Sequence, residues 1–238
     1  MRKTTAILLS GLLALSMTAC GTEDKTTGPQ STAAGTENET PTTESVDNRT
    51  ESTNTAETGN SNILVAYFAV METDGVDTVA GASRVAVNGE TLGNNEYIAQ
   101  IIQQQTGGDL FSIETVQEYP TTHDPLLEYA YNEQAENARP ELATQIENPD
   151  KYDVIFLGYP NWNADLPMPL YTFLEEYDFS GKTIIPFTTH GGSGFSRTIQ
   201  TISELQPNAT VVSDGLSISR NGVSRAEDEV IDWVNGVL

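Results

Sequence analysis

Three short segments of this chain combine glycine, asparagine and aromatic residues in a way that suits ligand binding. In chain order they are Leu92-Gly93-Asn94-Asn95, Pro160-Asn161-Trp162-Asn163 and Thr189-His190-Gly191-Gly192-Ser193. Glycine allows a ligand close to backbone N–H groups, and asparagine can cap a helix whose N-terminus attracts phosphate. A tryptophan ring can stack on a flat ligand. One ligand that has both a phosphate group and a planar ring would satisfy all three segments.

Each segment also has a purely structural explanation. Many helix starts contain Gly and Asn, and Trp162 can pack against its own loop as readily as against a ligand. The glycines at 191–192 can serve a flexible turn. His190 can donate a proton, contact a ring or act as a structural residue. The case for a site therefore depends on whether the fold brings the three segments together.

Apolar runs predict five β-strands. They cover residues 63–68, 110–116, 153–158 and 182–188, with a fifth inside 209–218. The first and third runs are apolar throughout, as in strands buried on both faces, whereas the second alternates like an edge strand. We expect the third strand to end at Gly158, because Pro160 has no N–H for a sheet ladder. The fifth is expected to be interrupted at Asp214-Gly215.

Helical patterns separate these strands. Ile98, Ile101 and Ile102 form an i, i+3, i+4 stripe, and Gly107-Gly108 should end that helix. Further helices are expected over 126–138, 170–177 and 195–202, and a capping box at 224–227 predicts the start of the last. The alternation predicts an α/β fold: a doubly wound, five-stranded parallel sheet with helices on both faces. In the flavodoxin-like strand order 2-1-3-4-5, the three segments follow neighbouring strands and meet at one edge.

The connection between the first strand and the first helix, residues 70–92, is too long for an ordinary βα loop. Within it, Asn88-Gly89 follows β-favouring residues and predicts a hairpin turn. We interpret this connection as an ordered insertion. It is either a lid over a ligand or surface decoration.

The first 60 residues predict export and tethering. Residues 1–20 have Arg2 and Lys3, an apolar run too short to span a bilayer, and a lipobox-like ending at Cys20. This pattern predicts a lipoprotein signal with lipidation of Cys20, the alternative being an ordinary cleaved signal. Residues 21–60 are rich in Thr, Ser and Glu and should form a disordered tether before a domain at 61–238. The location expected is extracytoplasmic, with the membrane contacted only through the lipid.

Composition excludes several classes of function. The net charge of −23 disfavours binding to nucleic acid or to anionic lipid headgroups. It suits solubility or docking to basic partners. With a single Cys in the chain, neither a disulfide framework nor a thiolate metal site can form, and no metal site is expected. A serine hydrolase centred on Ser193 is disfavoured, because Phe195 occupies the last glycine position of the Gly-x-Ser-x-Gly pattern.

The segments GYPNWNADLPMP, TTHGGSG and TGGDLF together resemble the flavodoxin family. The resemblance extends from about Ile63 to the C-terminus. It implies an FMN cofactor whose phosphate lies in the first segment and whose isoalloxazine ring lies between the second and third. It also implies flavin redox chemistry, with an unidentified redox partner or a quinone-like acceptor, and a possible homodimer.

The chain departs from the family pattern in the phosphate loop, which is typically Ser/Thr-x-Thr-Gly-Asn-Thr. Here the nearest match is residues 90–95, where Glu90, Leu92 and Asn95 replace the three hydroxyl side chains. In the second segment, Asn163 replaces a frequent second aromatic residue. The first functional hypothesis is therefore electron transfer or reduction of a small acceptor. The alternative is a degenerate flavodoxin-fold binding module without redox activity.

Overall fold

The computed structural model describes residues 62–73 and 84–238. These residues belong to a single compact unit, Asn54–Leu238. The predicted signal segment, Cys20, the tether and residues 74–83 of the insertion lie outside the described residues. Within the described ranges, none of the helices combines the length and the apolar character needed to cross a bilayer.

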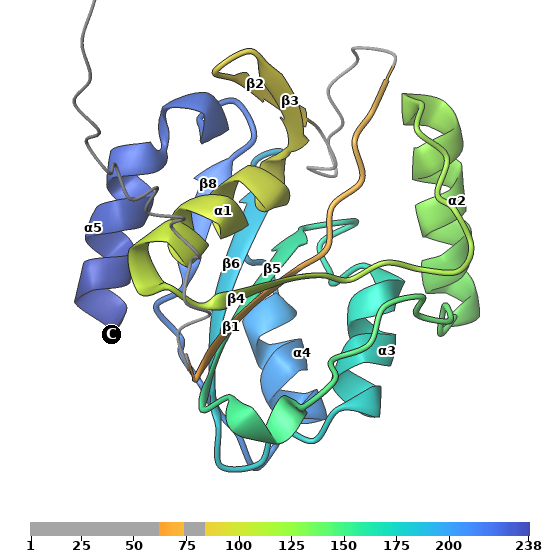
Figure 1. Ribbon diagram of the computed structural model, residues 1–238. Coiled ribbons are helices and arrows are strands. Elements are labelled where there is room, and N and C mark those ends of the chain that lie inside the picture. Colours follow the sequence, from red (N-terminus) through yellow and green to blue (C-terminus); the bar gives the residue numbers. More distant parts are fainter. Residues whose placement is uncertain (1–61, 74–83) are drawn as a thin grey trace, which may run out of the picture. The chain divides into compact units, whose positions relative to one another are not determined.

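A parallel sheet forms the centre of this unit (Figure 1). Its strands are β1 (Ile63–Tyr67), β4 (Asp109–Ser112), β5 (Val154–Pro160), β6 (Thr183–His190), β7 (Thr210–Val211) and β8 (Leu216–Ser219). The strand order is β4-β1-β5-β6-β7, and β8 also pairs with β6. Because β7 and β8 together make up the fifth predicted strand, the order 2-1-3-4-5 is confirmed, with β4 at the edge.

The break between β7 and β8 lies beside a proline of β6. Thr183 and Ile184 pair with β7, and Phe187 to His190 pair with β8, which leaves Pro186 opposite the break. Val212 donates to the Ile184 carbonyl on the same side of the strand. Pro186 has no N–H with which to donate a hydrogen bond to a strand on this side of β6. A continuous strand in place of β7 and β8 would therefore lack one ladder bond opposite Pro186. The predicted interruption at Asp214-Gly215 is confirmed.

The prediction that β5 ends at Gly158 is wrong. The strand continues through Tyr159 and Pro160, and Pro160 is the register partner of Thr189. The missing N–H of Pro160 faces the β1 side, where the last ladder bond runs from Phe68 N to Gly158 O. No ladder bond is lost on that side, while the next residue, Asn161, still donates to Thr189 O at 2.8 Å.

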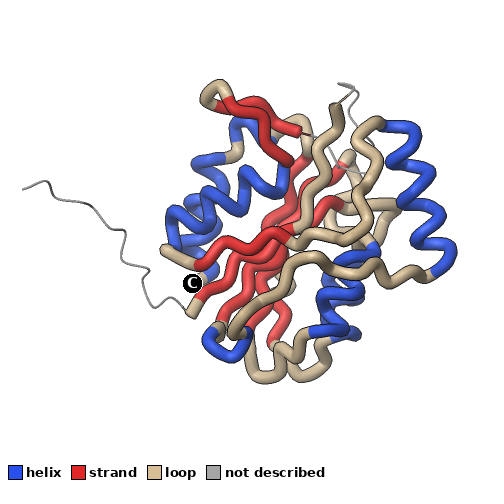
Figure 2. The backbone as a smooth tube through the Cα atoms, turned by 45° about the vertical axis from the view of Figure 1, so that its right-hand side comes forward, coloured by secondary structure: helices blue, strands red, loops and turns tan. Residues whose placement is uncertain are grey.

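Helices cover both faces of the sheet (Figure 2). They are α1 (Asn94–Thr106), α2 (His123–Glu136), α3 (Met168–Glu176), α4 (Thr198–Leu205) and α5 (Glu227–Val237). One core contains buried residues of α2, α3 and α4, with Leu64, Ile155 and Ile184 from the sheet. The other contains α1 and α5, with Val65 and Phe156. Neighbouring residues of one strand thus enter opposite cores, as strand pleating requires.

Two of the predicted helix boundaries had different outcomes. Gly107 adopts φ 65° directly after α1, so the predicted glycine stop is confirmed. The capping box predicted at 224–227 is wrong, because Val223–Arg225 forms a short 3₁₀ helix and α5 begins at Glu227. Ser224 is part of that turn and gives no side-chain cap to α5.

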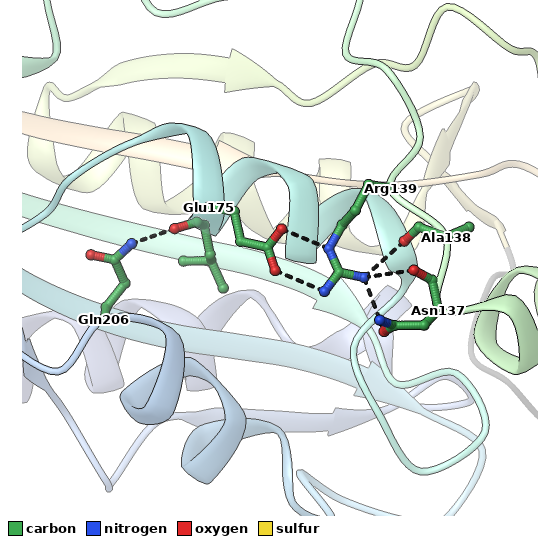
Figure 3. Close-up of polar contacts among 6 residues, drawn as sticks. Asn137, Ala138, Arg139, Glu175 and Gln206 are labelled. Carbon is green, nitrogen blue, oxygen red and sulfur yellow. Dashed lines mark hydrogen bonds and ion pairs between the residues drawn. The ribbon is translucent and has the colours of Figure 1, made fainter.

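Two polar clusters join the helices on the α3 side (Figure 3). After α2, Arg139 donates to both carboxylate oxygens of Glu175 on α3 at 2.7 Å, and its third nitrogen donates to carbonyls of the turn ending α2. The buried Gln206, which follows α4, donates to the Leu174 and Tyr177 carbonyls near the end of α3. These bonds satisfy carbonyls that a helix end leaves unpaired.

The described part of the insertion is a β-hairpin, β2 (Arg84–Val87) and β3 (Glu90–Gly93). Asn88 and Gly89 both have positive φ, 52° and 84°, as a two-residue type I′ turn requires. The predicted hairpin turn is confirmed. In Figure 1 the hairpin lies above the start of α1, at the carboxyl edge of the sheet.

Gly158 permits the close pairing of β5 with β6, and its substitution provides a test. A Cβ at this position would lie 2.1 Å from the Phe187 ring, whose side chain is fully buried. We predict that Gly158→Ala lowers the free energy of unfolding by about 1–3 kcal/mol, as overpacking does in cores. Urea unfolding measures the change.

Gly236→Ala is the matched control, because no atom lies within 4 Å of a Cβ built on Gly236 in α5. That variant should keep or slightly raise the stability. Equal stabilities for the two variants would contradict the packing argument.

Candidate functional site

The three segments meet at the carboxyl edge of the sheet, where β1, β5 and β6 end. Asn95, in the first turn of α1, donates from Nδ2 to the Thr189 hydroxyl of β6 at 3.0 Å, and both side chains are buried. Asn161, after β5, donates from its backbone N–H to Thr189 O at 2.8 Å. Thr189 is therefore a common partner of the first and second segments. The structure brings the predicted segments together, as the strand order implied.

The first segment starts α1 close to the point where β1 ends. A Cβ on Gly93 would lie 2.8 Å from the Cβ of Ala69, which follows β1. The end of the insertion, at Gly93, therefore lies next to its beginning after β1. Only glycine fits this approach without a shift. Asn94 and Asn95 follow as the first residues of α1, whose first N–H groups have no partner within the helix.

A carboxylate that the sequence reasoning missed also lies at this helix start. Glu96 accepts a hydrogen bond from the Gly93 N–H at 3.0 Å. The glutamate is three residues after the N-cap, the spacing of a capping box, which was the available signal. Glu90, the carboxylate that sequence comparison placed in the phosphate loop, is exposed at the turn end of β3. Leu92 lies in β3 and packs into the α1/α5 core.

The second and third segments are joined by the Asn161 side chain. Its Nδ2 donates to Gly194 O at 2.6 Å and to the Ser196 hydroxyl at 3.0 Å. Ser196 has φ 51°, so this loop takes a backbone conformation that costs energy for a serine. Asn161 thus holds the loop after β6 in place.

The third segment begins inside the sheet. β6 continues to His190, so the loop starts only at Gly191, and Gly191, Gly192 and Ser193 are exposed. The Nδ1 atom of His190 accepts from the Gly192 N–H at 2.9 Å. Burial lowers the pKa of His190 below its ordinary value of 6.5, which favours the neutral ring that this bond needs.

The Trp162 ring lies inside an aromatic cluster. Its side chain is 3% exposed and contacts Phe68 edge-on at 5.5 Å and Tyr119 at 5.7 Å between ring centroids. Trp162 and Asp165 exchange backbone hydrogen bonds around a tight turn. Asn163 and Ala164 form that turn with φ of 53° and 64°, which explains an asparagine where an aromatic residue is frequent among relatives. A direct contact between Trp162 and a flavin ring stays a prediction.

Phe68 and Tyr119 were not among the predicted site residues. The Tyr119 hydroxyl donates to the buried carboxylate of Glu133 at 2.6 Å. Burial raises the pKa of Tyr119, and the bond to Glu133 raises it further. Burial also raises the pKa of Glu133. Phe68 and Tyr119 line a cavity of about 320 Å³ at the carboxyl ends of β1 and β4, a volume within the range of ligand pockets.

Three buried polar atoms in the predicted segments have no hydrogen-bond partner among the described residues. They are Asn95 Oδ1, Asn161 Oδ1 and Trp162 Nε1. Buried polar groups are rarely unpaired, so such atoms at one edge point to a ligand that would pair with them. Two are acceptors and one is a donor. A flavin, which carries ring N–H, ring carbonyl and ribityl hydroxyl groups, fits this set. Within the described ranges, no group of three or more His, Cys, Asp or Glu side chains is placed to hold a metal ion.

Comparison with known proteins agrees with this fold. The flavodoxin family profile matches residues 84–237, more than half of the chain. The chain therefore belongs to the flavodoxin family. The search of curated proteins gave no significant match.

Solved structures similar to this chain come from several bacteria. A candidate flavoprotein from Bacteroides uniformis is 22% identical, with a TM-score of 0.55, and covers 74% of this chain and 98% of its own. One from Bacteroides eggerthii is 25% identical, with a TM-score of 0.51 and coverages of 74% and 96%. A Lactobacillus acidophilus flavoprotein in complex with FMN is 17% identical, with a TM-score of 0.46 and coverages of 70% and 96%.

Asn161→Asp tests whether the Asn161 amide holds the loop after β6. A carboxylate cannot donate to Gly194 O or Ser196 Oγ and would face two oxygens instead. We predict a loss of about 1–3 kcal/mol in the free energy of unfolding, as for a buried hydrogen bond left unmade. Urea unfolding measures it.

Asn208→Asp makes the same chemical change at an exposed position and serves as the control. If both variants unfold at the same urea concentration as the wild type, the loop does not depend on Asn161.

Proposed function

We propose that this protein binds FMN at the carboxyl edge of its sheet and transfers electrons to a partner protein or a small acceptor such as a quinone. The observation that carries the proposal is the set of buried, unpaired polar atoms of Asn95, Asn161 and Trp162 at that edge. Membership of the flavodoxin family supports it. The adjoining cavity, which Phe68 and Tyr119 line together with polar residues, offers space for a ring.

The residues of the chain would divide the binding of the cofactor between them. The N-terminus of α1 would hold the phosphate through its unpaired N–H groups and partial positive charge. The amide oxygens of Asn95 and Asn161 would accept hydrogen bonds from the flavin, and Trp162 Nε1 would donate one. Phe68 and Tyr119 would exclude water beside the ring. FMN itself would supply one- or two-electron redox chemistry, with the surrounding hydrogen bonds and charges tuning its potential.

The purified domain, residues 61–238, titrated with FMN, tests the proposal. The expected result is a yellow complex with a shifted flavin spectrum and quenched flavin fluorescence. Trp162→Phe should weaken FMN binding about three- to tenfold, because it removes one hydrogen-bond donor at a buried position. Trp233→Phe on α5, the other tryptophan of the chain, should leave the affinity unchanged.

A colourless domain that does not quench FMN fluorescence would sink the proposal. It would favour the alternative, a flavodoxin-fold binding module without redox activity. Equal effects of Trp162→Phe and Trp233→Phe on affinity would count against a hydrogen bond from Trp162 Nε1 while leaving the cofactor in place.

We also propose that the protein is a lipoprotein outside the cytoplasm. The support is the signal-like segment that ends at Cys20, the only cysteine of the chain. Expressed at full length in bacteria, the wild type should appear in the membrane fraction and incorporate a fatty-acid label. Cys20→Ala should abolish both, and Thr22→Ala, two residues further on, should change neither. A wild type without label would contradict the lipid anchor.

A further inference from the structure

Arg84 lies directly beside the residue that begins α1. In the β2–β3 ladder, Arg84 is the register partner of Gly93. Val87 and Glu90 flank the two-residue turn and form a hydrogen-bonded pair. Hydrogen-bonded and non-hydrogen-bonded pairs alternate along an antiparallel ladder, so the third pair further on, Arg84–Gly93, is a non-hydrogen-bonded pair. The Cα atoms of such a pair are about 4.5 Å apart. In agreement with this, the Gly93 N–H is directed to Glu96 and not to β2.

The Arg84 side chain lies on the face of the hairpin that meets the end of β1. Residues on the opposite face, Val85 and Leu92, pack into the core. The face of the hairpin that carries Arg84 contacts Ala69, because a Cβ built on Gly93 would lie 2.8 Å from the Ala69 Cβ. Arg84 Nη1 donates to the Glu72 carbonyl in the segment that follows β1. The Arg84 side chain therefore leaves the hairpin beside the start of α1 and extends to the segment that follows β1, and the Arg84 residue remains exposed.

The carboxylate at this helix start favours a cation as a partner in binding a phosphate. The Glu96 carboxylate accepts from Gly93 N–H at the N-terminus itself. Burial raises the pKa of Tyr67 at the end of β1, and the carboxylates of Glu96 and Glu114 raise it further. The Glu96 carboxylate at the helix start repels a phosphate dianion. A guanidinium offsets that repulsion and can donate two parallel hydrogen bonds to phosphate oxygens.

We propose that Arg84 binds the phosphate of the flavin nucleotide together with the first N–H groups of α1. This inference rests on the proposed function. It assigns the hairpin a role in binding a phosphate monoester, in place of the three hydroxyl side chains that Glu90, Leu92 and Asn95 replace. Arg84 therefore determines the preference of the site for FMN over riboflavin, because the two ligands differ only by the phosphate.

Dissociation constants for FMN and riboflavin, measured by flavin fluorescence on the purified domain, test the role of Arg84. The wild type should prefer FMN. Arg84→Met should weaken FMN binding about 10- to 100-fold, as expected for a hydrogen-bonded charge, and change riboflavin binding less than about twofold. Arg84→Lys, which keeps the charge but not the paired donors, should fall between. The salt dependence of FMN binding should be shallower in Arg84→Met.

Lys151→Met is the charge-matched control. Lys151 pairs with Asp109, the first residue of β4, at the amino edge of the sheet, so its loss should leave both affinities unchanged. Unchanged riboflavin binding in Arg84→Met also shows that the variant is folded. An Arg84→Met domain that retains the wild-type preference for FMN, or a wild type that binds the two flavins equally, overturns the role of Arg84. A wild type that binds neither flavin overturns the proposed function itself.

Discussion

The position of β5 between β1 and β6 is the constraint on which the rest of the structure depends. Its parallel register places Gly158 opposite Tyr67 on one side and opposite Phe187 on the other. Parallel strands end at a common edge, so this register brings the ends of the three strands together. Asn95, Asn161 and Thr189 can then form one buried hydrogen-bonded junction. Gly158 has no Cβ to meet the Phe187 ring, so it permits the close pairing of β5 with β6 at this edge.

Two additions to a standard flavodoxin-like fold shape this edge. The insertion returns a hairpin to the end of β1, where Gly93 fits against Ala69, and it adds an arginine beside an otherwise acidic helix start. The aromatic cluster of Phe68, Tyr119 and Trp162 forms the floor on the β4 side. Under the proposed function, the hairpin would contribute charge and the cluster would flank the ring of the cofactor.

The predicted hairpin turn and the predicted end of the first helix held because each depends on one or two residues. Asn88-Gly89 specified a turn because few other residues tolerate two successive positive φ angles, and Gly107 ended a helix for the same reason. The prediction for Pro160 failed because a proline is harmful only if its N–H side faces a strand, and β1 has already ended there. The capping box at Ser224 failed because a 3₁₀ turn takes those residues. Glu96 was not predicted, although its spacing from Gly93 is that of a capping box.

The sequence by itself determined the alternation of strands and helices, the flavodoxin family pattern and the three segments that meet at the sheet edge. These follow from local periodicity and from turn residues, which act over a few positions along the chain. Only the tertiary structure decided that Trp162 is buried among Phe68 and Tyr119, that Asn161 supports a neighbouring loop, and that Arg84 lies beside Gly93. Those contacts join residues up to 94 positions apart, as Asn95 and Thr189 are, and no local pattern encodes such a pair.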